Sequence, residues 1–574
     1  MKISNFYKKN DDLDFILKSF DWDKIIRAKE GDFQNQLSED DLNDIAESYA
    51  MVLDTVGKIA DDVIAKNAKV IDEKGLDFKA GKVIFPKEVK ENLKQFEELC
   101  IGGLSTPADF GGMNCPNIIA TAILDIISAA DGSIHNFVGL TFGIADSIDE
   151  FCSDEVKAKY LPLFASEGYT GAMALTEPDA GTDLSNVRTK ATLDDKTGKW
   201  ILNGTKRFIT NGCGDVVLVL ARSEDKEGAR GLSFFLVEKE QIEVTKIEHK
   251  LGIHGSPTCE IYFNNSEGIL IGERGKGLTK YTINLMNHAR IGTAAQACGI
   301  AQAAYDEALQ YSDERVQFGK KIKEIPAVAD LLMNTKINLE AMRNLTYTAS
   351  MYYELKNCLE KKLEKEGVDE RQMRKDPEYK KYKKLSSVIT PMTKYYTTES
   401  CNKIAYDCMQ ILGGNGYMQE FNTERHYRDA RITSIYEGTS QIQVAMSAGG
   451  ILTDGLNDIF ADFEAKVANE EKCAELLKQT NVLKAKLDEA ITLINDKKDE
   501  VFKDLYVKHL VDLACDTLIA YIFTSHAKLS ERKKLVASKF LNAALSKAEM
   551  SLSFIKNGDN STVDRFDDII YGGN

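Results

Sequence analysis

The sequence predicts a mostly helical α+β protein of several domains, in which one small β domain is inserted between helical domains. Apolar residues recur at helical spacing from about residue 12 to 168 and again from about 281 to 450. Between these stretches, runs rich in β-branched and aromatic residues alternate with turn signals. A chain of 574 residues is also too long for a single hydrophobic core, so three or four domains are expected.

The first expected domain, 1–170, is helical. Its periodic segments include DDLNDIAESYAMVLDTVGKIADDVIAKNA and IIATAILDIISAADG, and proline falls outside both runs. The pattern changes near Gly171, where short runs such as KWILNGTKRFITNG, DVVLVLARS, LSFFLVEK and TCEIYFNNS begin. These runs predict a β domain over 171–285.

Helical periodicity returns over 286–450 and predicts a second helical domain. Within it, 18 of the 29 residues at 356–384 are charged, which favours a solvated helical excursion over a binding patch. After the AGG at 448–450, residues 451–574 again have helical periodicity and more acids than bases. They predict an acidic C-terminal helical extension.

Composition narrows the function classes. A net charge of −16 disfavours nucleic acid as a partner, because phosphate binding needs a concentrated basic surface. The 11 cysteines form no CxxC pair, which indicates reduced thiols and no metal site. The N-terminus lacks a signal-like apolar region, and no stretch approaches about 20 uninterrupted apolar residues. We therefore expect a cytoplasmic protein with no membrane segment.

Four short motifs carry the chemical signal. In chain order they are ALTEPDAGTD at 174–183, RVQFG at 315–319, QILGGNG at 410–416 and IYEGTSQIQ at 435–443. The first predicts a strand that leads into a tight turn whose hydroxyls and free N–H groups suit an oxygen-rich ligand, although an ordinary turn is the alternative. Arg315 could clamp a pyrophosphate or be a solvated surface arginine. Gly413 and Gly414 allow close backbone approach at a helix end, or form a plain C-cap.

Together, on a helix–sheet–helix background, the four motifs resemble the acyl-CoA dehydrogenase family from about residue 40 to 450. The resemblance implies an enzyme that desaturates an acyl-CoA thioester with FAD and passes electrons to an electron-transferring flavoprotein. It implies FAD contacts, some made to the FAD of a neighbouring subunit, at Met173, Leu175, Thr176, Phe208, Thr210, Arg315, Phe318, Gln410, Gly413, Gly414, Thr439 and Gln441. Because some contacts cross subunits, at least a dimer is implied. Substrate contacts are implied at Thr182, Asn287, Arg290 and Gly438.

Phe208 and Thr210 stand two residues apart in KRFITNG, so a regular strand would place both on one face. Simple strand packing is the alternative interpretation. In the family the matching strand covers the flavin ring, often with Trp where this chain has Phe208.

Glu437 is the predicted catalytic base, because a carboxylate in the apolar setting IYEGT is poorly placed for a purely structural role. A glutamate at a helix N-terminus is the alternative. In the family the base stands either here or at the position of Ala289, which cannot accept a proton. By resemblance, the backbone N–H of Glu437 would also polarise the thioester carbonyl.

Gly139–Gly143 and the segment KLGIHGSPTC at 250–259 resemble the long branch of the family typified by 3-methylmercaptopropionyl-CoA dehydrogenase. The C-terminal extension fits that branch and favours a dimer over a tetramer. His254 is interpreted as a turn or flavin-edge residue rather than a catalyst, and Phe137 and Leu140 as candidates for the border of the acyl pocket. An acyl-CoA oxidase and a flavin-containing DNA-associated protein are the rival functions.

Overall fold

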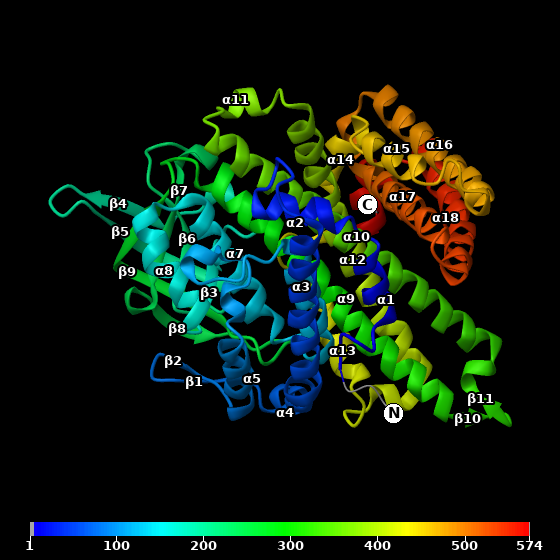
Figure 1. Cartoon of the computed structure of the whole chain (residues 1–574), viewed down its shortest axis with the longest axis horizontal. Coiled ribbons are helices and arrows are strands. Elements are labelled where there is room, and N and C mark those ends of the chain that lie inside the picture. Colours follow the sequence, from blue (N-terminus) through cyan, green and yellow to red (C-terminus); the bar gives the residue numbers. More distant parts are fainter. Residues whose placement is uncertain (1–4, 573–574) are drawn as a thin grey trace. The chain divides into compact units, whose positions relative to one another are not determined.

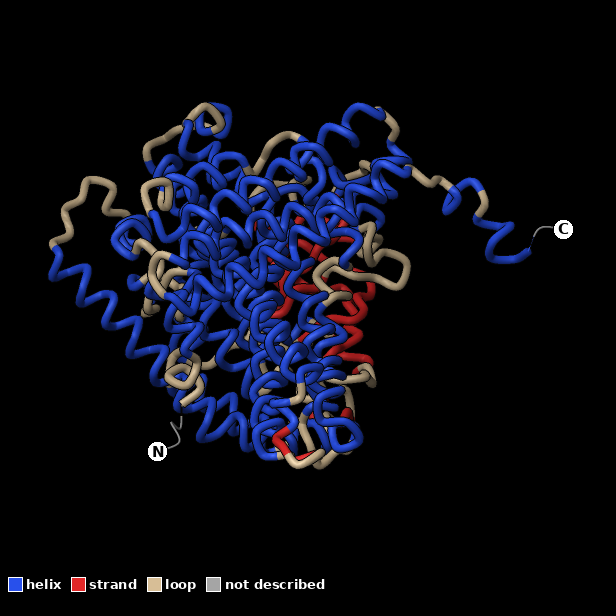
Figure 2. The backbone as a smooth tube through the Cα atoms, turned by 90° about the vertical axis from the view of Figure 1, so that its right-hand side faces the viewer, coloured by secondary structure: helices blue, strands red, loops and turns tan. Residues whose placement is uncertain are grey.

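The computed structural model describes residues 5–572, which group into two compact units. The first unit comprises the chain up to Leu339 together with Ser400–Gly438, and the second comprises Glu340–Glu399 and the chain from Thr439 onward. Figure 2 shows most of the strands gathered together, with helices making up most of the remaining chain. The predicted α+β class with a helical majority matches this arrangement.

The first unit opens with helices and one small hairpin. The helices are α1 Asp11–Lys18, α2 Trp22–Glu30, α3 Glu39–Ile59, α4 Ala65–Lys74, α5 Lys87–Glu98, α6 Asn117–Ala130, α7 His135–Phe151 and α8 Asp154–Ser166. A capping box starts α3, because the Ser38 hydroxyl accepts from the Asp41 N–H and the Asp41 carboxylate accepts from the Ser38 N–H. The hairpin, β1 Asp77–Lys79 and β2 Lys82–Ile84, was not expected from the helical periodicity.

The seven long strands of the first unit form one sheet. They are β3 Gly171–Ala174, β4 Lys190–Asp194, β5 Lys199–Thr210, β6 Val216–Arg222, β7 Leu232–Glu238, β8 Glu243–Ile247 and β9 Thr258–Ile271. The sheet order is β3-β6-β4-β5-β9-β7, with β8 against β9. Because β7 pairs with both β9 and β6, the sheet closes on itself.

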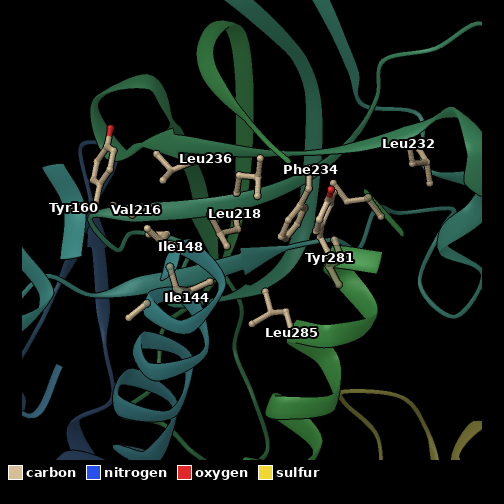
Figure 3. Packing of buried hydrophobic residues seen from close by; sticks show 14 of the residues in the cluster. Ile144, Ile148, Tyr160, Val216, Leu218, Leu232, Phe234, Leu236, Tyr281 and Leu285 are labelled. Atoms are coloured by element: carbon tan, nitrogen blue, oxygen red, sulfur yellow. The ribbon is translucent and has the colours of Figure 1, made fainter. Parts of the chain in front are cut away.

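The surroundings of strand β6 explain why its sequence, VVLVLAR, is apolar without alternation. Val217 and Val219 pack with Phe235 and Ile261 in a cluster inside the closed sheet. Leu218 faces the other way and packs with helical side chains such as Ile144 from α7 and Leu285 from the long helix that follows the sheet, which Figure 3 shows from close by. A strand buried on both faces is therefore apolar at every position.

After the sheet, the long helix α9 Ile283–Glu314 crosses the core of the first unit, and α13 Thr423–Thr433 packs against it. The short strands β10 Val316–Gln317 and β11 Lys320–Lys321 form a hairpin directly after α9. Helices α10 Pro326–Lys365 and α12 Pro377–Leu412 contribute residues to both units. The short helix α11 Glu370–Met373 lies between them, within the charged stretch.

The second unit also contains α14 Ser440–Leu452, at the end of the predicted domain 286–450. The predicted C-terminal extension forms the helices α15 Asn457–Ala465, α16 Ala474–Lys497, α17 Glu500–Ala527, α18 Glu531–Asn557 and α19 Ser561–Asp564. Helices α16, α17 and α18 lie side by side toward the red end of the chain in Figure 1. In the described part of the chain, α17 alone has the length and apolarity to cross a membrane, and 94% of its apolar window is buried inside the fold.

Candidate active site

Glu437 lies in a turn between α13 and α14 and is half-buried. Its φ is 55° and that of Gly438 is 93°, so both residues adopt left-handed backbone conformations. Helix α14 starts only at Ser440, after the N-cap Thr439, and Glu437 is therefore outside the helix. A glutamate in this strained region persists only where its surroundings impose it, as is common at functional sites.

The neighbours of the turn come from α9. The buried Arg290 donates Nε–H to the backbone carbonyl of Glu437 at 3.5 Å and Nη1–H to Asn287 Oδ1 at 2.9 Å. Tyr436 is anchored on the same helix, because its hydroxyl donates to Gln296 Oε1. The predicted substrate-contact residues Asn287 and Arg290 are thus brought to the predicted base.

Burial lowers the pKa of the Arg290 guanidinium to about 10, while the Glu437 carboxylate acts to raise it. Arg290 therefore remains protonated at neutral pH and places a positive charge near the carboxylate. Ala289, on the same helix, is half-buried and carries only a methyl group.

The loop after β3 carries the predicted flavin-edge residues. Met173 and Thr176 are half-buried, and Leu175 is buried. The Thr176 carbonyl accepts from the Arg207 N–H at 2.9 Å, so the loop is joined to β5 just before Phe208. Glu177 and Ala180 exchange backbone hydrogen bonds of 3.0 and 3.1 Å and close the tight turn that the sequence predicts.

Phe208 faces outward because of a bulge in β5. Trp200, Leu202 and Lys206 are buried, so regular alternation would also bury Phe208. The pairing with β9 shifts between Lys206 and Ile209, and Phe208 adopts a φ of 62°. The result is a Phe208 that is 54% exposed, followed by a buried Ile209 and a half-buried Thr210. The regular strand on which the same-face prediction for Phe208 and Thr210 rested is thus interrupted by a bulge at Phe208.

One buried ion pair beneath this loop was missed by the sequence reasoning. Lys206 Nζ donates to Glu177 Oε1 and to the Leu175 carbonyl, both at 2.8 Å. Burial lowers the pKa of Lys206 to about 8, and despite its own burial Glu177 has a lowered pKa because Lys206 lies beside it. Glu177 also accepts from the backbone N–H groups of Arg188 and Thr189 at 2.7 and 2.9 Å. The sequence did carry one signal of this pair: Lys206 falls at a position that strand alternation turns toward the buried side.

Thr182 is exposed on the same loop, next to Asp183, whose side chain accepts from the Ser185 N–H at 3.1 Å. The exposed Thr182 therefore lies on an ordered turn, where its hydroxyl is accessible to solvent. This position is open to a large ligand such as the coenzyme A moiety.

Arg315 and Phe318 lie at the end of α9. Arg315 is the C-cap residue and is exposed, and its carbonyl accepts from the Ile322 N–H at 2.9 Å across the β10–β11 hairpin. Phe318 and Gly319 form the hairpin turn with φ of 53° and 77°. The Phe318 side chain is 94% exposed, which is unusual for a large apolar group without a partner surface.

Gln410 and Gly413–Gly414 lie at the end of α12. Gly413 takes the left-handed conformation, φ 61°, just after the last helical residue, as the C-cap interpretation predicts. No atom lies within 4 Å of a Cβ built on Gly413 or Gly414, so this backbone is open to a ligand. Asn415 Nδ2 donates to the Tyr311 hydroxyl at 3.0 Å and thereby brings this segment to the end of α9 that carries Arg315.

Thr439 and Gln441 begin α14 in the second unit. Thr439 is half-buried and Gln441 is exposed, so a helix N-terminus presents both residues. Between them, the Ser440 hydroxyl donates to Glu399 Oε1.

His254 is held in a structural contact. Its Nδ1 lies 2.9 Å from both the Asp72 carbonyl and Asp72 Oδ1, and its Nε2 lies 2.9 Å from the Lys250 carbonyl. The hydrogen bond to Asp72 raises the pKa of His254 to about 9. With both ring nitrogens engaged, His254 is better suited to fixing the 250–257 connection than to moving protons, in line with the turn interpretation.

The two acyl-pocket candidates on α7 differ in position. Phe137 is buried and lines a cavity of about 340 Å³ together with residues of α5, α7 and α8 such as Phe96, Phe142 and Phe164. Leu140 is half-buried and is not part of that lining. Among residues 5–572, no group of three or more His, Cys, Asp and Glu side chains could hold a metal ion.

Comparison with known families matches three consecutive regions. The acyl-CoA dehydrogenase N-terminal domain matches 46–168, the middle domain 172–266, and the C-terminal domain 275–361 and 374–452. The break in the last match falls within the charged stretch 356–384. The chain belongs to the acyl-CoA dehydrogenase family. It is therefore an oxidoreductase of the class that acts on CH–CH bonds, with FAD as cofactor.

Among curated relatives, 3-methylmercaptopropionyl-CoA dehydrogenase of Ruegeria pomeroyi is 33% identical over 70% of this chain and 70% of its own length. An acyl-CoA dehydrogenase of Bacillus subtilis is 37% identical over 59% of this chain and 84% of its own length. An NADH-dependent acryloyl-CoA reductase of Anaerotignum propionicum is 34% identical over 64% and 87%.

Among solved structures, butyryl-CoA dehydrogenase of Megasphaera elsdenii is 29% identical, with a TM-score of 0.60 over 73% of this chain and 99% of its own. An acyl-CoA dehydrogenase of Bacillus anthracis complexed with FAD covers 91% of this chain and 90% of its own, with a TM-score of 0.74 at 23% identity. At that identity the likeness concerns the fold, and a coverage of 91% must include part of the C-terminal extension.

The side chains present suit FAD in two places. The exposed Phe208 ring with the hydroxyls of Thr176 and Thr210 suits the flat isoalloxazine ring and its polar edge. The exposed Arg315 guanidinium and the open Gly413–Gly414 backbone suit a pyrophosphate.

Proposed function

We propose that the protein dehydrogenates an acyl-CoA thioester to the trans-2-enoyl-CoA, with Glu437 removing the α proton. The observation that carries this proposal is the placement of Glu437 in a strained turn held by the buried, charged Arg290. The other family position for the base is Ala289, which has no proton acceptor. Of these two positions, only 437 carries a carboxylate in this chain, so Glu437 is the proposed base.

The α C–H of a thioester is a weak acid, so the carbonyl must be polarised as the proton leaves. The backbone N–H of Glu437, whose direction is set by the left-handed turn, is the proposed donor on the protein side. Arg290 fixes that turn through the Glu437 carbonyl and keeps a positive charge beside the carboxylate. Asn287 in turn orients the guanidinium.

FAD, when bound, supplies the acceptor for the β hydrogen, which leaves as hydride. Phe208 stacks on the flavin ring in this proposal, and Thr176 and Thr210 bond its polar edge. Met173 and Leu175 border the ring, and Gly438 and Thr182 contact the substrate. Arg315, Phe318, Gln410, Gly413 and Gly414 reach the FAD of a second subunit, and Thr439 and Gln441 complete the FAD contacts. The exposure of Phe318 supports a role outside its own chain.

The proposed electron acceptor is an electron-transferring flavoprotein. Support comes from a similar solved structure, described as an electron transferring flavoprotein of Acidaminococcus fermentans, with 31% identity and a TM-score of 0.59 over 73% of this chain. Two relatives are named as reductases, one for acryloyl-CoA and one for 3-(aryl)acrylate, at 34% identity each. The direction of the reaction in the cell is thus a second question for experiment.

The test is anaerobic flavin bleaching with a panel of saturated acyl-CoA thioesters of graded length and shape, including a methylthio acyl group. Loss of the oxidised flavin absorbance with at least one thioester, and formation of the matching enoyl-CoA, is expected. Failure of all saturated thioesters, together with rapid reoxidation of reduced enzyme by enoyl-CoA, would assign a reductase instead. Peroxide release equal to turnover in air would assign an oxidase.

A further inference from the structure

Cys213 and Cys259 meet beside the strand that carries Phe208 and Thr210. The two side chains lie close together, and each shifts the pKa of the other. Both are free thiols; Cys213 is half-buried and Cys259 is buried. Cys213 packs on the same apolar cluster inside the sheet to which Cys259 belongs.

A sharp turn creates this contact between residues 46 positions apart in the chain. Asn211, with φ of 53°, donates its N–H to the Pro257 carbonyl at 2.8 Å and its Nδ2 to the Gly171 carbonyl at 3.0 Å. The Gly214 N–H returns to the Asn211 carbonyl at 2.8 Å. The turn therefore folds the Cys213 thiol back toward the start of β9, where Cys259 stands.

The backbone is close enough here that only glycine fits beside the thiols. A Cβ built on Gly212 would lie 2.9 Å from the Cβ of Cys259. The pairing of the two thiols is thus imposed by main-chain hydrogen bonds on both sides of the turn.

The two thiols differ in character. The neighbouring Cys259 thiol lowers the pKa of Cys213, although burial and Asp215 oppose this. The neighbouring Cys213 and burial raise the pKa of Cys259. Lys250, whose ammonium donates to the Ser256 carbonyl at 2.6 Å, adds a positive charge next to Cys259. Cys213 is therefore the more acidic and more accessible thiol, and Cys259 is its buried neighbour.

We propose that Cys213 and Cys259 form a reversible oxidation site, in which peroxide converts the thiol pair to a disulfide. The Cys213 thiol releases its proton, its thiolate attacks a peroxide oxygen, and the O–O bond breaks to give a sulfenic acid and hydroxide, which takes up that proton to form water. The Cys259 thiol then attacks the Cys213 sulfur, the S–O bond breaks, and a second water leaves. Hydrogen peroxide is reduced to two waters as two thiols are oxidised. The disulfide ties the turn that follows Thr210 to the strand that begins at Thr258, its partner in the sheet.

The sequence makes the test direct, because trypsin places each thiol in its own peptide. Cleavage after Arg207 and Arg222 releases 208–222, with Cys213, and cleavage after Lys250 and Arg274 releases 251–274, with Cys259. Holoenzyme is treated with hydrogen peroxide, alkylated without reduction, digested and analysed by mass spectrometry. We expect the two peptides to appear linked in most chains, and thiol reductant to restore both alkylated peptides.

Three variants sharpen the result. In Cys259→Ser the sulfenic acid has no resolving thiol, so the reagent dimedone is expected to label Cys213 several-fold more than in wild type. In Cys213→Ser, Cys259 is expected to stay unlabelled because it is buried. Cys100→Ser removes an exposed cysteine and is expected to leave the cross-link unchanged. Recovery of both Cys213 and Cys259 as alkylated thiols from wild type, under conditions that oxidise Cys100, would overturn the proposal. So would overoxidation of Cys213 in wild type without any linked peptide.

Discussion

Arg290 and Glu437 lie 147 positions apart in the chain, and the Arg290 Nε–H donates to the Glu437 carbonyl at 3.5 Å. This contact fixes the backbone of the predicted base rather than its carboxylate. The carboxylate of Glu437 is the group proposed to accept the α proton, and a substitution that removes it tests that role.

Glu437→Gln is expected to keep the fold and FAD but to slow anaerobic flavin bleaching by about 10²–10⁴-fold, because the amide cannot accept the α proton. Stopped-flow absorbance with the best thioester measures the effect. Glu420→Gln, at an exposed position, is the matched control and should bleach at the wild-type rate. Partial recovery in Glu437→Gln with Ala289→Glu would support the two-position geometry. Near-wild-type bleaching by Glu437→Gln would show that another group takes the proton.

Arg315→Ala is expected to weaken FAD retention, because a charge-assisted pyrophosphate contact is lost. If this contact crosses subunits, FAD loss and subunit dissociation promote each other by mass action. The FAD to protein ratio and the mass after serial dilution measure both. Arg374→Ala removes a positive charge from an exposed ion pair with Glu370 and should retain FAD. Full FAD at high dilution in Arg315→Ala would refute the assignment.

Lys206→Met is expected to destabilise the fold by about 3–5 kcal/mol, because it leaves the Glu177 carboxylate buried without its partner. Adding Glu177→Gln should recover part of that loss. The control is Lys199→Met, on the same strand as Lys206. It breaks an exposed ion pair with Glu267 and should cost about 0–1 kcal/mol. Urea unfolding of the four proteins measures the differences, and equal losses for Lys206→Met and Lys199→Met would contradict the prediction.

His254 is expected to stabilise the protein most at low pH. Its pKa is raised to about 9 in the folded protein from the usual 6.5, mainly by the Asp72 hydrogen bond. The contribution is therefore fully present below pH 6.5 and is lost as the pH rises through about 9. The difference in unfolding free energy between wild type and His254→Gln should shrink over this range. The ammonium groups of Lys206 and Lys250 also lose their protons at high pH, because burial lowers their pKa values to about 8. Both lysines are present in wild type and variant, so their contributions to the unfolding free energy cancel in the difference. A difference that is constant from pH 6 to 10 would rule out a protonated His254.

Light scattering of the holoenzyme is expected to give a dimer of about 128 kDa, twice the 63.9 kDa chain. The reason is that the helices of residues 451–572 are expected to occupy surface through which shorter relatives form tetramers. A species near 256 kDa would reject this prediction. Because FAD contacts are proposed to cross subunits, the measurement requires fully loaded protein.

Much of the fold follows from local patterns in the chain. The helical and strand periodicities predict the order helix, sheet, helix, helix, because amphipathic spacing reports directly which residues face a core. Turn chemistry likewise predicts the tight turn at 177–180, since proline and glycine restrict the backbone locally. The β1–β2 hairpin was missed because its strands are only three residues long and half-exposed, so they carry almost no periodic signal.

The identity of the candidate site residues also came from the sequence, since four spaced motifs together define a family that single motifs do not. What only the tertiary structure decided is how these residues are presented. The outward turn of Phe208 depends on a bulge, the strain at Glu437 depends on Arg290 from a distant helix, and Lys206 meets Glu177 inside the fold. Each depends on contacts between residues far apart in the chain, and such contacts leave no local periodicity to read. The pairing of Cys213 with Cys259 has the same origin, because a turn and a neighbouring strand bring together two thiols that the sequence shows only as isolated cysteines.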